Sequence, residues 1–155
     1  MKLEPNVFDI WVFRRTGADV RYLLLHTSRV KAERHFNGGR FWQIPSDVVI
    51  EGETLLAALE RTLARFGIEA TGIWAAELSY TIYNRRFDAT QIIHVFAAEA
   101  GAEAVRLDPE EHAESRWCSF DEALALVTYR GLRDGLRSTR EFITGRVPPR
   151  ELQLK

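Results

Sequence analysis

The chain has 155 residues, of which 46% are hydrophobic and 28% are charged, and its formal net charge at pH 7 is -1. These values are typical of one globular domain, which at this length can bury roughly two-thirds of the surface that its unfolded chain exposes. A net charge so close to zero gives no general attraction to nucleic acid or to a membrane surface, so neither is an expected partner.

Targeting signals and cysteine usage favour a cytoplasmic protein. The N-terminus has neither the basic flank nor the sustained apolar core of a signal peptide, and no apolar run approaches the about 20 residues that span a bilayer. The single cysteine, Cys118, cannot form an internal disulfide and suits a reducing compartment. It lies in a strand-like run without an activating histidine, which favours a packed thiol over a nucleophile.

The N-terminal part of the chain predicts a β-hairpin followed by a basic loop. Residues 7–14 and 20–26 are rich in β-formers and are joined by a turn that contains glycine. A polar loop is expected over residues 27–40, and a short strand over residues 41–44. The basic side chains of the loop are Arg29, Lys31, Arg34, His35 and Arg40.

The central segment predicts one amphipathic helix over residues 55–66. Thr54 is a suitable N-cap, and Gly67 stands where a glycine commonly ends a helix. Apolar side chains recur at spacings of three and four and predict one buried stripe. The stripe consists of Leu56, Leu59, Leu63 and Phe66.

The remainder predicts further strands and then C-terminal helices. Together with the first half, this order indicates one α/β domain over residues 1–155, a mixed β-sheet covered by helices on both faces. Ser119 or Asp121 is expected to cap the first of these helices, and residues 146–155 are expected to form a mobile tail. The expected strands are residues 74–83, 90–98 and 116–119, and the expected helices are residues 122–127 and 129–144.

Residues 41–68 carry a recognisable pattern in which Gly52-Glu53-Thr54 lead into a helix that bears Arg61 and ends near Gly67-Ile68. The pattern resembles the signature of the Nudix hydrolases, G-x5-E-x7-R-E-U-x-E-E-x-G-U, where U is aliphatic. Aligned on Glu53, the signature arginine is Arg61 and the first glycine is replaced by Asp47. In the family the first glutamate and the arginine brace the loop against the helix, and this pair is retained.

The glutamates that should follow are missing. Aligned on Glu53, they fall on Thr62, Arg65 and Phe66; aligned backward from Gly67, they fall on Arg61, Ala64 and Arg65, so the signature is also one residue short. In the family these glutamates converge on Mg²⁺, a hard cation that takes oxygen ligands and polarises water and phosphate. An arginine repels a cation, so metal use is expected to be weak or absent, with Mg²⁺ the implied cofactor if the protein is active.

Three features outside the signature are closest to the dihydroneopterin triphosphate pyrophosphatase-like branch of the family. They are the sequence Phe-Trp-Gln at residues 41–43, Glu111-His112 ahead of an aromatic strand at Trp117, and the closing helical run. The resemblance implies the Nudix α/β/α sandwich. It also implies P–O–P hydrolysis of a nucleoside diphosphate linked to another moiety, or of a nucleoside or pterin triphosphate.

The resemblance also implies a set of candidate site residues. Glu53 and Glu111 would be the remaining acidic residues for catalysis and metal binding, although a lone glutamate such as Glu111 in this polar segment is more often an ordinary solvated loop residue. Arg65 stands where relatives hold a cation, so it could meet a phosphate directly, or it could simply coat a helix that binds nothing. The candidate substrate-binding residues are Arg61, Arg65, Arg40, Trp42 and His35.

Three functions therefore remain open. The first is a pyrophosphohydrolase weakened by the lost glutamates. The second is a non-catalytic sensor that binds a phosphorylated small molecule such as a nucleotide. The third is a protein-interaction domain, with a homodimer as one form of it.

Overall fold

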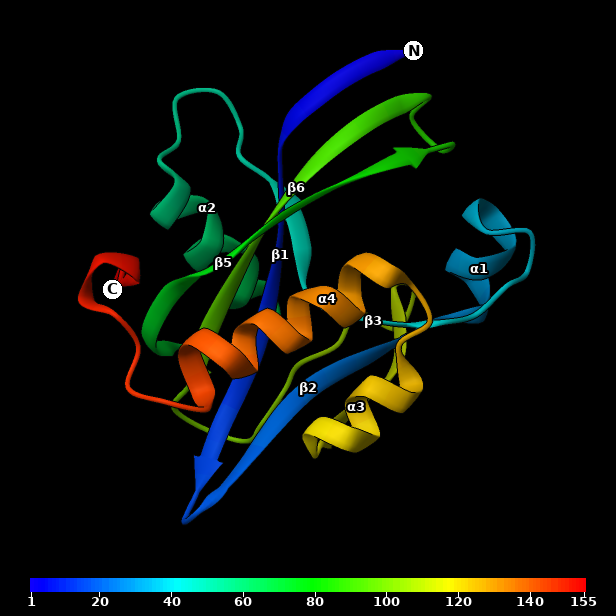
Figure 1. The fold of residues 1–155 in the computed structure, drawn as a ribbon. Coiled ribbons are helices and arrows are strands. Elements are labelled where there is room, and N and C mark those ends of the chain that lie inside the picture. Colours follow the sequence, from blue (N-terminus) through cyan, green and yellow to red (C-terminus); the bar gives the residue numbers. More distant parts are fainter.

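The computed structural model describes residues 1–155 and is organised around one mixed, seven-stranded sheet (Figure 1). Its main path runs in the order β3-β2-β1-β6-β5, with β4 paired to β1 and β7 paired to β2. Only the β1–β6 pair is parallel. The strands are β1 (Lys2–Thr16), β2 (Asp19–Thr27), β3 (Trp42–Gln43), β4 (Ser46–Val48), β5 (Ala70–Asn84), β6 (Ala89–Ala100) and β7 (His112–Cys118).

Helices cover both faces of the sheet, as the sequence predicts. Alternating side chains of β1 enter two separate cores, because successive residues of a strand point to opposite faces. Phe8, Ile10 and Val12 pack under α2 (Leu55–Arg65), whereas Trp11 and Phe13 pack on the opposite face. The helices of that second face, seen crossing the sheet in Figure 1, are α3 (Phe120–Leu126), α4 (Arg130–Thr139) and its π-helical extension η1 (Arg140–Thr144).

The predicted helix caps are confirmed. The hydroxyl of Thr54 accepts a hydrogen bond from the backbone N–H of Ala57 at 3.2 Å and begins α2. Ser119, not Asp121, caps α3 by accepting the N–H of Glu122 at 3.2 Å. Gly67 has a φ of 67° just beyond α2, a conformation that glycine adopts without strain.

One helix was not predicted. The expected polar loop over residues 27–40 contains α1 (Arg29–His35), which Ser28 caps by accepting the N–H of Lys31 at 3.0 Å. Only Ala32 of this helix is buried, so the segment lacks the apolar periodicity by which helices are recognised. The turn that follows, at Asn37-Gly38, is present, and both residues have positive φ.

The C-terminal residues, for which the sequence predicts a mobile tail, lie against the sheet. After the short helix η2 (Arg150–Leu152), the N–H of Leu154 donates to the carbonyl of Ile73 at 2.8 Å. The ammonium group of Lys155 lies 2.8 Å from the carboxylate of Glu60 on α2. The edge strand β5 supplies the free backbone groups that hold the tail, and composition alone does not reveal them. No helix in the chain is both long enough and apolar enough to cross a membrane.

Candidate ligand cleft

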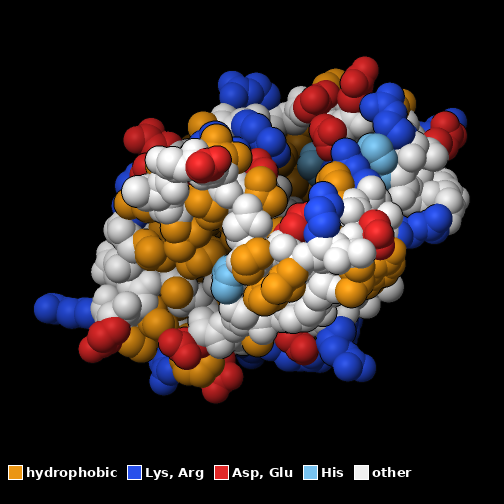
Figure 2. Space-filling model, turned by 90° about the horizontal axis from the view of Figure 1, so that it is seen from above, with side chains coloured by type: hydrophobic (Ala, Val, Ile, Leu, Met, Phe, Trp, Pro, Cys, Tyr) orange, Lys and Arg blue, Asp and Glu red, His pale blue; other side chains and the backbone are white.

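A cleft of about 720 Å³ opens at the end of the sheet, and the hollow is visible in Figure 2. Figure 1 shows the β5–β6 turn and α1, which supply two of its walls, at this end of the sheet. Segments far apart in the sequence build its walls: α1, residues 43–48, the end of α2, the β5–β6 turn and the loop before β7. In Figure 2 charged side chains of both signs surround the hollow. The charged and imidazole side chains that line the cleft are Lys31, Asp47, Arg65, Arg86, Asp108, Glu111 and His112.

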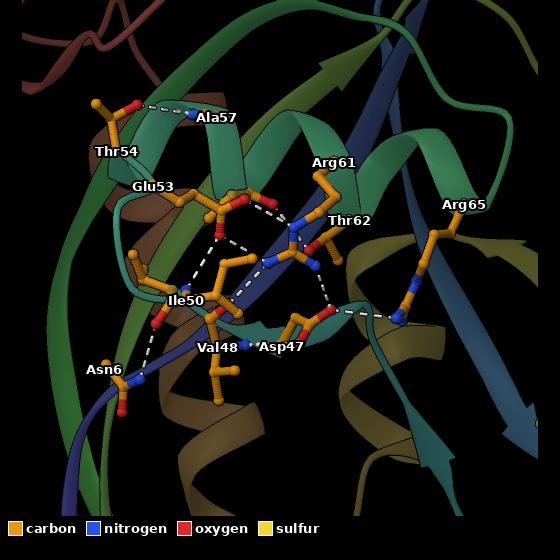
Figure 3. A network of polar contacts seen from close by, with 12 residues as sticks. Asn6, Asp47, Val48, Ile50, Glu53, Thr54, Ala57, Arg61, Thr62 and Arg65 are labelled. Carbon is orange, nitrogen blue, oxygen red and sulfur yellow. Dashed lines mark hydrogen bonds and ion pairs between the residues drawn. The ribbon is translucent and has the colours of Figure 1, made fainter.

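The Arg61 guanidinium is fully engaged beside the cleft (Figure 3). Its Nε and Nη2 donate to the two carboxylate oxygens of Glu53 at 2.8 and 2.9 Å. Nη1 donates to Asp47 at 3.0 Å, and Nη2 also donates to the carbonyl of Val48 at 2.8 Å. These bonds lower the pKa of Glu53 and raise that of Arg61. Neither residue lines the cleft, so the pair braces the loop against α2 and leaves no side-chain group of either residue facing a ligand.

Arg65, one turn further along α2, does line the cleft. Its side chain is 58% exposed, and its Nη1 lies 3.1 Å from the same Asp47 oxygen that Arg61 contacts. The other two positions at which the signature calls for glutamates, aligned on Glu53, are buried, and of these only Phe66 also contributes to the cleft lining. Thr62 is 0% exposed and its hydroxyl donates to the carbonyl of Ala58 at 2.9 Å, while Phe66 is buried.

Glu111 lines the cleft, where it forms an ion pair with the ammonium group of Lys31 at 2.9 Å. The hydrogen bond from Lys31 lowers the pKa of Glu111. Lys31 comes from α1, and only the fold shows that this member of the basic loop reaches the acidic residue. In the sequence Lys31 is one of several basic residues of a polar segment, and no motif marks Asp47 or Arg86 as cleft residues.

His112 is an unusual member of the cleft wall. It is 7% exposed, and neither ring nitrogen has a hydrogen-bond partner. Burial and then the charge of Lys31 lower its pKa to about 4, so the ring is neutral at physiological pH. Its ring centroid lies 5.8 Å from that of Phe66. A buried polar group without a partner typically costs about 1–3 kcal/mol, so this residue is retained at the expense of stability.

The other three candidate substrate-binding residues lie outside the cleft lining. Strand alternation turns Gln43 toward the cleft and its neighbour Trp42 toward the opposite face, where Trp42 stacks on His26 with ring centroids 4.5 Å apart. Arg40 donates from Nε to the carbonyl of Thr27 at 2.9 Å. His35 packs edge-on against Phe36, 6.2 Å between centroids.

With this geometry in place, comparison with known proteins decides the family. The NUDIX domain model matches residues 3–138. The chain belongs to the Nudix family. No curated protein sequence matches the chain significantly.

Solved Nudix structures share the fold at low sequence identity. A putative Nudix hydrolase from Listeria monocytogenes has a TM-score of 0.73 at 18% identity, covering 92% of this chain and 96% of that one. The Nudix domain of Shewanella oneidensis NrtR, complexed with ADP-ribose, gives 0.68 at 16%, covering 91% and 89%. The E. coli dihydroneopterin triphosphate pyrophosphohydrolase gives 0.64 at 15%, covering 92% and 99%.

Nudix proteins typically use a divalent metal, but the donor groups of this cleft do not fit one. No three Asp, Glu, His or Cys side chains are grouped so that they could share an ion. Each of the three carboxylates that line the cleft already contacts a donor: Asp47 contacts two arginines, Glu111 contacts Lys31 through one oxygen, and Asp108 contacts the N–H of Glu110 through one oxygen at 3.0 Å. Mg²⁺ bound by protein usually needs carboxylates together with phosphate oxygens in a near-octahedral set. In this cleft α2 contributes Arg65, a cation, and no carboxylate.

Proposed function

We propose that this Nudix protein binds a phosphorylated small molecule, such as a nucleoside diphosphate derivative, in the cleft and hydrolyses P–O–P bonds slowly or not at all. The fold supports the ligand class, because one structural relative is complexed with ADP-ribose and another is a pterin triphosphate pyrophosphohydrolase. The cleft volume of about 720 Å³ lies in the usual range for small-molecule sites.

One observation carries the proposal: α2 presents Arg65 to the cleft at a signature glutamate position, and no three acidic or imidazole side chains are grouped there to share a metal ion. Attack of water on a pyrophosphate requires a group that takes up a proton and positive charge that balances the leaving phosphate. The pKa of Glu111 is lowered by its ion pair with Lys31, which makes it a poor general base at neutral pH. Arg65 supplies positive charge, so the cleft supports binding better than turnover.

We assign roles to the candidate residues accordingly. Arg65 contacts the phosphorylated ligand, and Glu111 is the acidic residue that remains within reach of it. Glu53 and Arg61 hold the loop that carries Asp47. A metal-dependent hydrolase with substantial turnover remains the alternative, and the exposed position of Glu111 favours it, because breaking one ion pair would free that carboxylate.

The test combines binding and turnover on one panel. ADP-ribose, ADP, dATP and dihydroneopterin triphosphate are each added to the purified protein in Mg²⁺ and, separately, in EDTA. Thermal unfolding reports binding, and release of phosphate or pyrophosphate reports hydrolysis. We expect a stabilised protein with at least one phosphorylated compound and turnover close to background.

Two results would contradict the proposal. Rapid Mg²⁺-dependent hydrolysis that is abolished by Glu111→Gln would establish the hydrolase. No response to any compound in either buffer would leave the interaction domain.

A further inference from the structure

The geometry points to a metal-free anion site in which the guanidinium groups of Arg65 and Arg86 hold the phosphate of the ligand. This inference rests on the proposed function and adds to it the groups that bind and the absence of a metal requirement. The two arginines come from different walls of the same cleft, Arg65 from the end of α2 and Arg86 from the β5–β6 turn.

Arg65 is the outer end of a chain of alternating charges (Figure 3). Glu53 binds Arg61, Arg61 binds Asp47, and Asp47 lies 3.1 Å from Nη1 of Arg65. Asp47 is itself fixed, because β4 pairs with β1 and its carboxylate also accepts the N–H of Val48 at 2.8 Å. One edge of the Arg65 guanidinium is therefore anchored, while Nε and Nη2 have no protein partner and remain available to a ligand.

The guanidinium group of Arg86 has fewer protein contacts than that of Arg65 and leaves more N–H groups free for a ligand. Its guanidinium makes no ion pair and no hydrogen bond within the protein, and it lies over the ring of Phe87 at 4.8 Å. Such stacking leaves the edge donors of the guanidinium free. The turn that carries it is held by Asn84, whose side-chain oxygen accepts the N–H of Arg86 at 3.0 Å. Arg86 also contributes to the lowered pKa of Glu111, which places its charge near the acidic side of the cleft.

Both arginines leave N–H donors free in the cleft. Formal charges balance, since three cations (Lys31, Arg65, Arg86) face three carboxylates (Asp47, Asp108, Glu111). Each carboxylate already has a donor on at least one oxygen, with one oxygen free on Asp108 and one on Glu111, and both guanidinium groups keep free N–H groups. Guanidinium pairs bidentately with phosphate, and such charge-assisted bonds are among the strong ones. The site therefore suits a phosphate or diphosphate group.

The consequence is an inverted response to magnesium. In a metal-dependent site Mg²⁺ strengthens nucleotide binding, because the ion joins the carboxylates to the phosphates. Here the phosphates meet arginines directly, and Mg²⁺ bound to free ADP neutralises the charge that the arginines recognise. Binding of ADP should therefore be tightest in EDTA and weaker in Mg²⁺.

Calorimetry with ADP tests this on the full chain in EDTA and in Mg²⁺. Arg65→Gln and Arg86→Gln should each weaken binding about tenfold or more, as loss of a charge-assisted hydrogen bond does, and the double variant should weaken it further. The matched control is Arg137→Gln on α4, whose side chain is 52% exposed and likewise pairs with one carboxylate, Asp134. Adenosine, which lacks the phosphates, should bind far more weakly than ADP.

The outcomes separate the inference from the proposed function. ADP binding that requires Mg²⁺ would overturn the metal-free site and leave a nucleotide-binding Nudix protein. Binding in EDTA that neither Arg65→Gln nor Arg86→Gln weakens, or that Arg137→Gln weakens equally, would overturn the assignment of the two arginines. Adenosine that binds as tightly as ADP would do the same. A protein that binds no phosphorylated compound in either buffer would overturn both.

Discussion

Two arginines one turn apart on α2, Arg61 and Arg65, have different tasks. Arg61, near the middle of the helix, is saturated by Glu53, Asp47 and a backbone carbonyl, whereas Arg65 in the last turn has one anchoring contact and faces the cleft. The first arginine braces the loop against the helix, and the second places a positive charge in the cleft where the signature has a glutamate. The contacts that hold the loop in place and the charge that lines the cleft can therefore be changed separately, because Arg61 makes the former and Arg65 supplies the latter.

The largest expected effect on stability comes from placing a glutamate at Thr62, one of the positions at which the Nudix signature has a glutamate. Thr62 is fully buried under the sheet, so Thr62→Glu would place a carboxylate in the core without a partner. We expect a loss of about 4 kcal/mol or more in the free energy of unfolding, measured by urea denaturation. Ala64→Glu, on the exposed side of the same helix, is the control and should change stability by less than about 1 kcal/mol. Equal stability of the two variants would show that α2 is rotated from the described position.

The second-largest loss of stability is expected when the ion pairs of Arg61 with Glu53 and Asp47 are removed. Arg61→Ala removes four hydrogen bonds and leaves Glu53 and Asp47 as neighbouring carboxylates without their shared cation. We expect a loss of about 3 kcal/mol, since hydrogen bonds to charged groups contribute about 1.5–3 kcal/mol each and water partly replaces them here. Arg137→Ala removes a single exposed ion pair and should cost under about 1 kcal/mol. If Arg61→Ala lowered the free energy of unfolding by no more than Arg137→Ala, the loop would be held by its backbone contacts alone.

A pH effect of about 2 kcal/mol is expected at the cleft wall. Because His112 has a pKa of about 4 in the folded protein and about 6.5 when unfolded, the unfolded chain binds its proton first as pH falls. Its contribution to stability is therefore complete above about pH 6.5 and is lost progressively down to about pH 4. Between pH 7 and pH 5 the loss should be about 2 kcal/mol.

His112→Phe isolates that titration. The substitution keeps a ring against Phe66 and removes two unpartnered nitrogens, so it should raise stability at pH 7 as well as flatten the pH dependence. Urea denaturation at several pH values gives both quantities from one variant. A slope that persists unchanged in His112→Phe would assign the acid sensitivity to other groups.

The sequence predicted α2 and its bracing contacts better than it predicted the residues that line the cleft. The cap at Thr54, the buried stripe of α2 and the retained Glu53–Arg61 pair are local or closely spaced in the chain, so their spacing predicts their contacts. The ion pair between Lys31 and Glu111 joins residues 80 positions apart and depends on how α1 meets the loop before β7. No periodicity encodes such a contact.

Side-chain direction explains the remaining differences. Trp42 and Gln43 are adjacent, and one of them had to face the cleft; the register of β3 against β2 decides in favour of Gln43. The contact of the tail with β5 has a different cause: it is made by backbone groups at the free edge of the strand, which are the same whatever the sequence, so composition does not predict it.

The smallest change in stability, and the sharpest in chemistry, is expected from Arg65→Glu. This position is exposed, so the free energy of unfolding should change by less than about 1 kcal/mol. The new glutamate would stand near Asp47 and share the cleft with Glu111, which creates a set of carboxylates at the position where the Nudix signature places its metal ligands. We expect Mn²⁺, followed by its electron paramagnetic resonance signal, to bind this variant and not the parent, while ADP binding in EDTA is lost. Arg65→Gln serves as the control, because it removes the cation without adding an acid and should lose ADP without gaining Mn²⁺. Mn²⁺ binding to the parent as strong as to Arg65→Glu would show that this arginine does not keep cations out of the cleft.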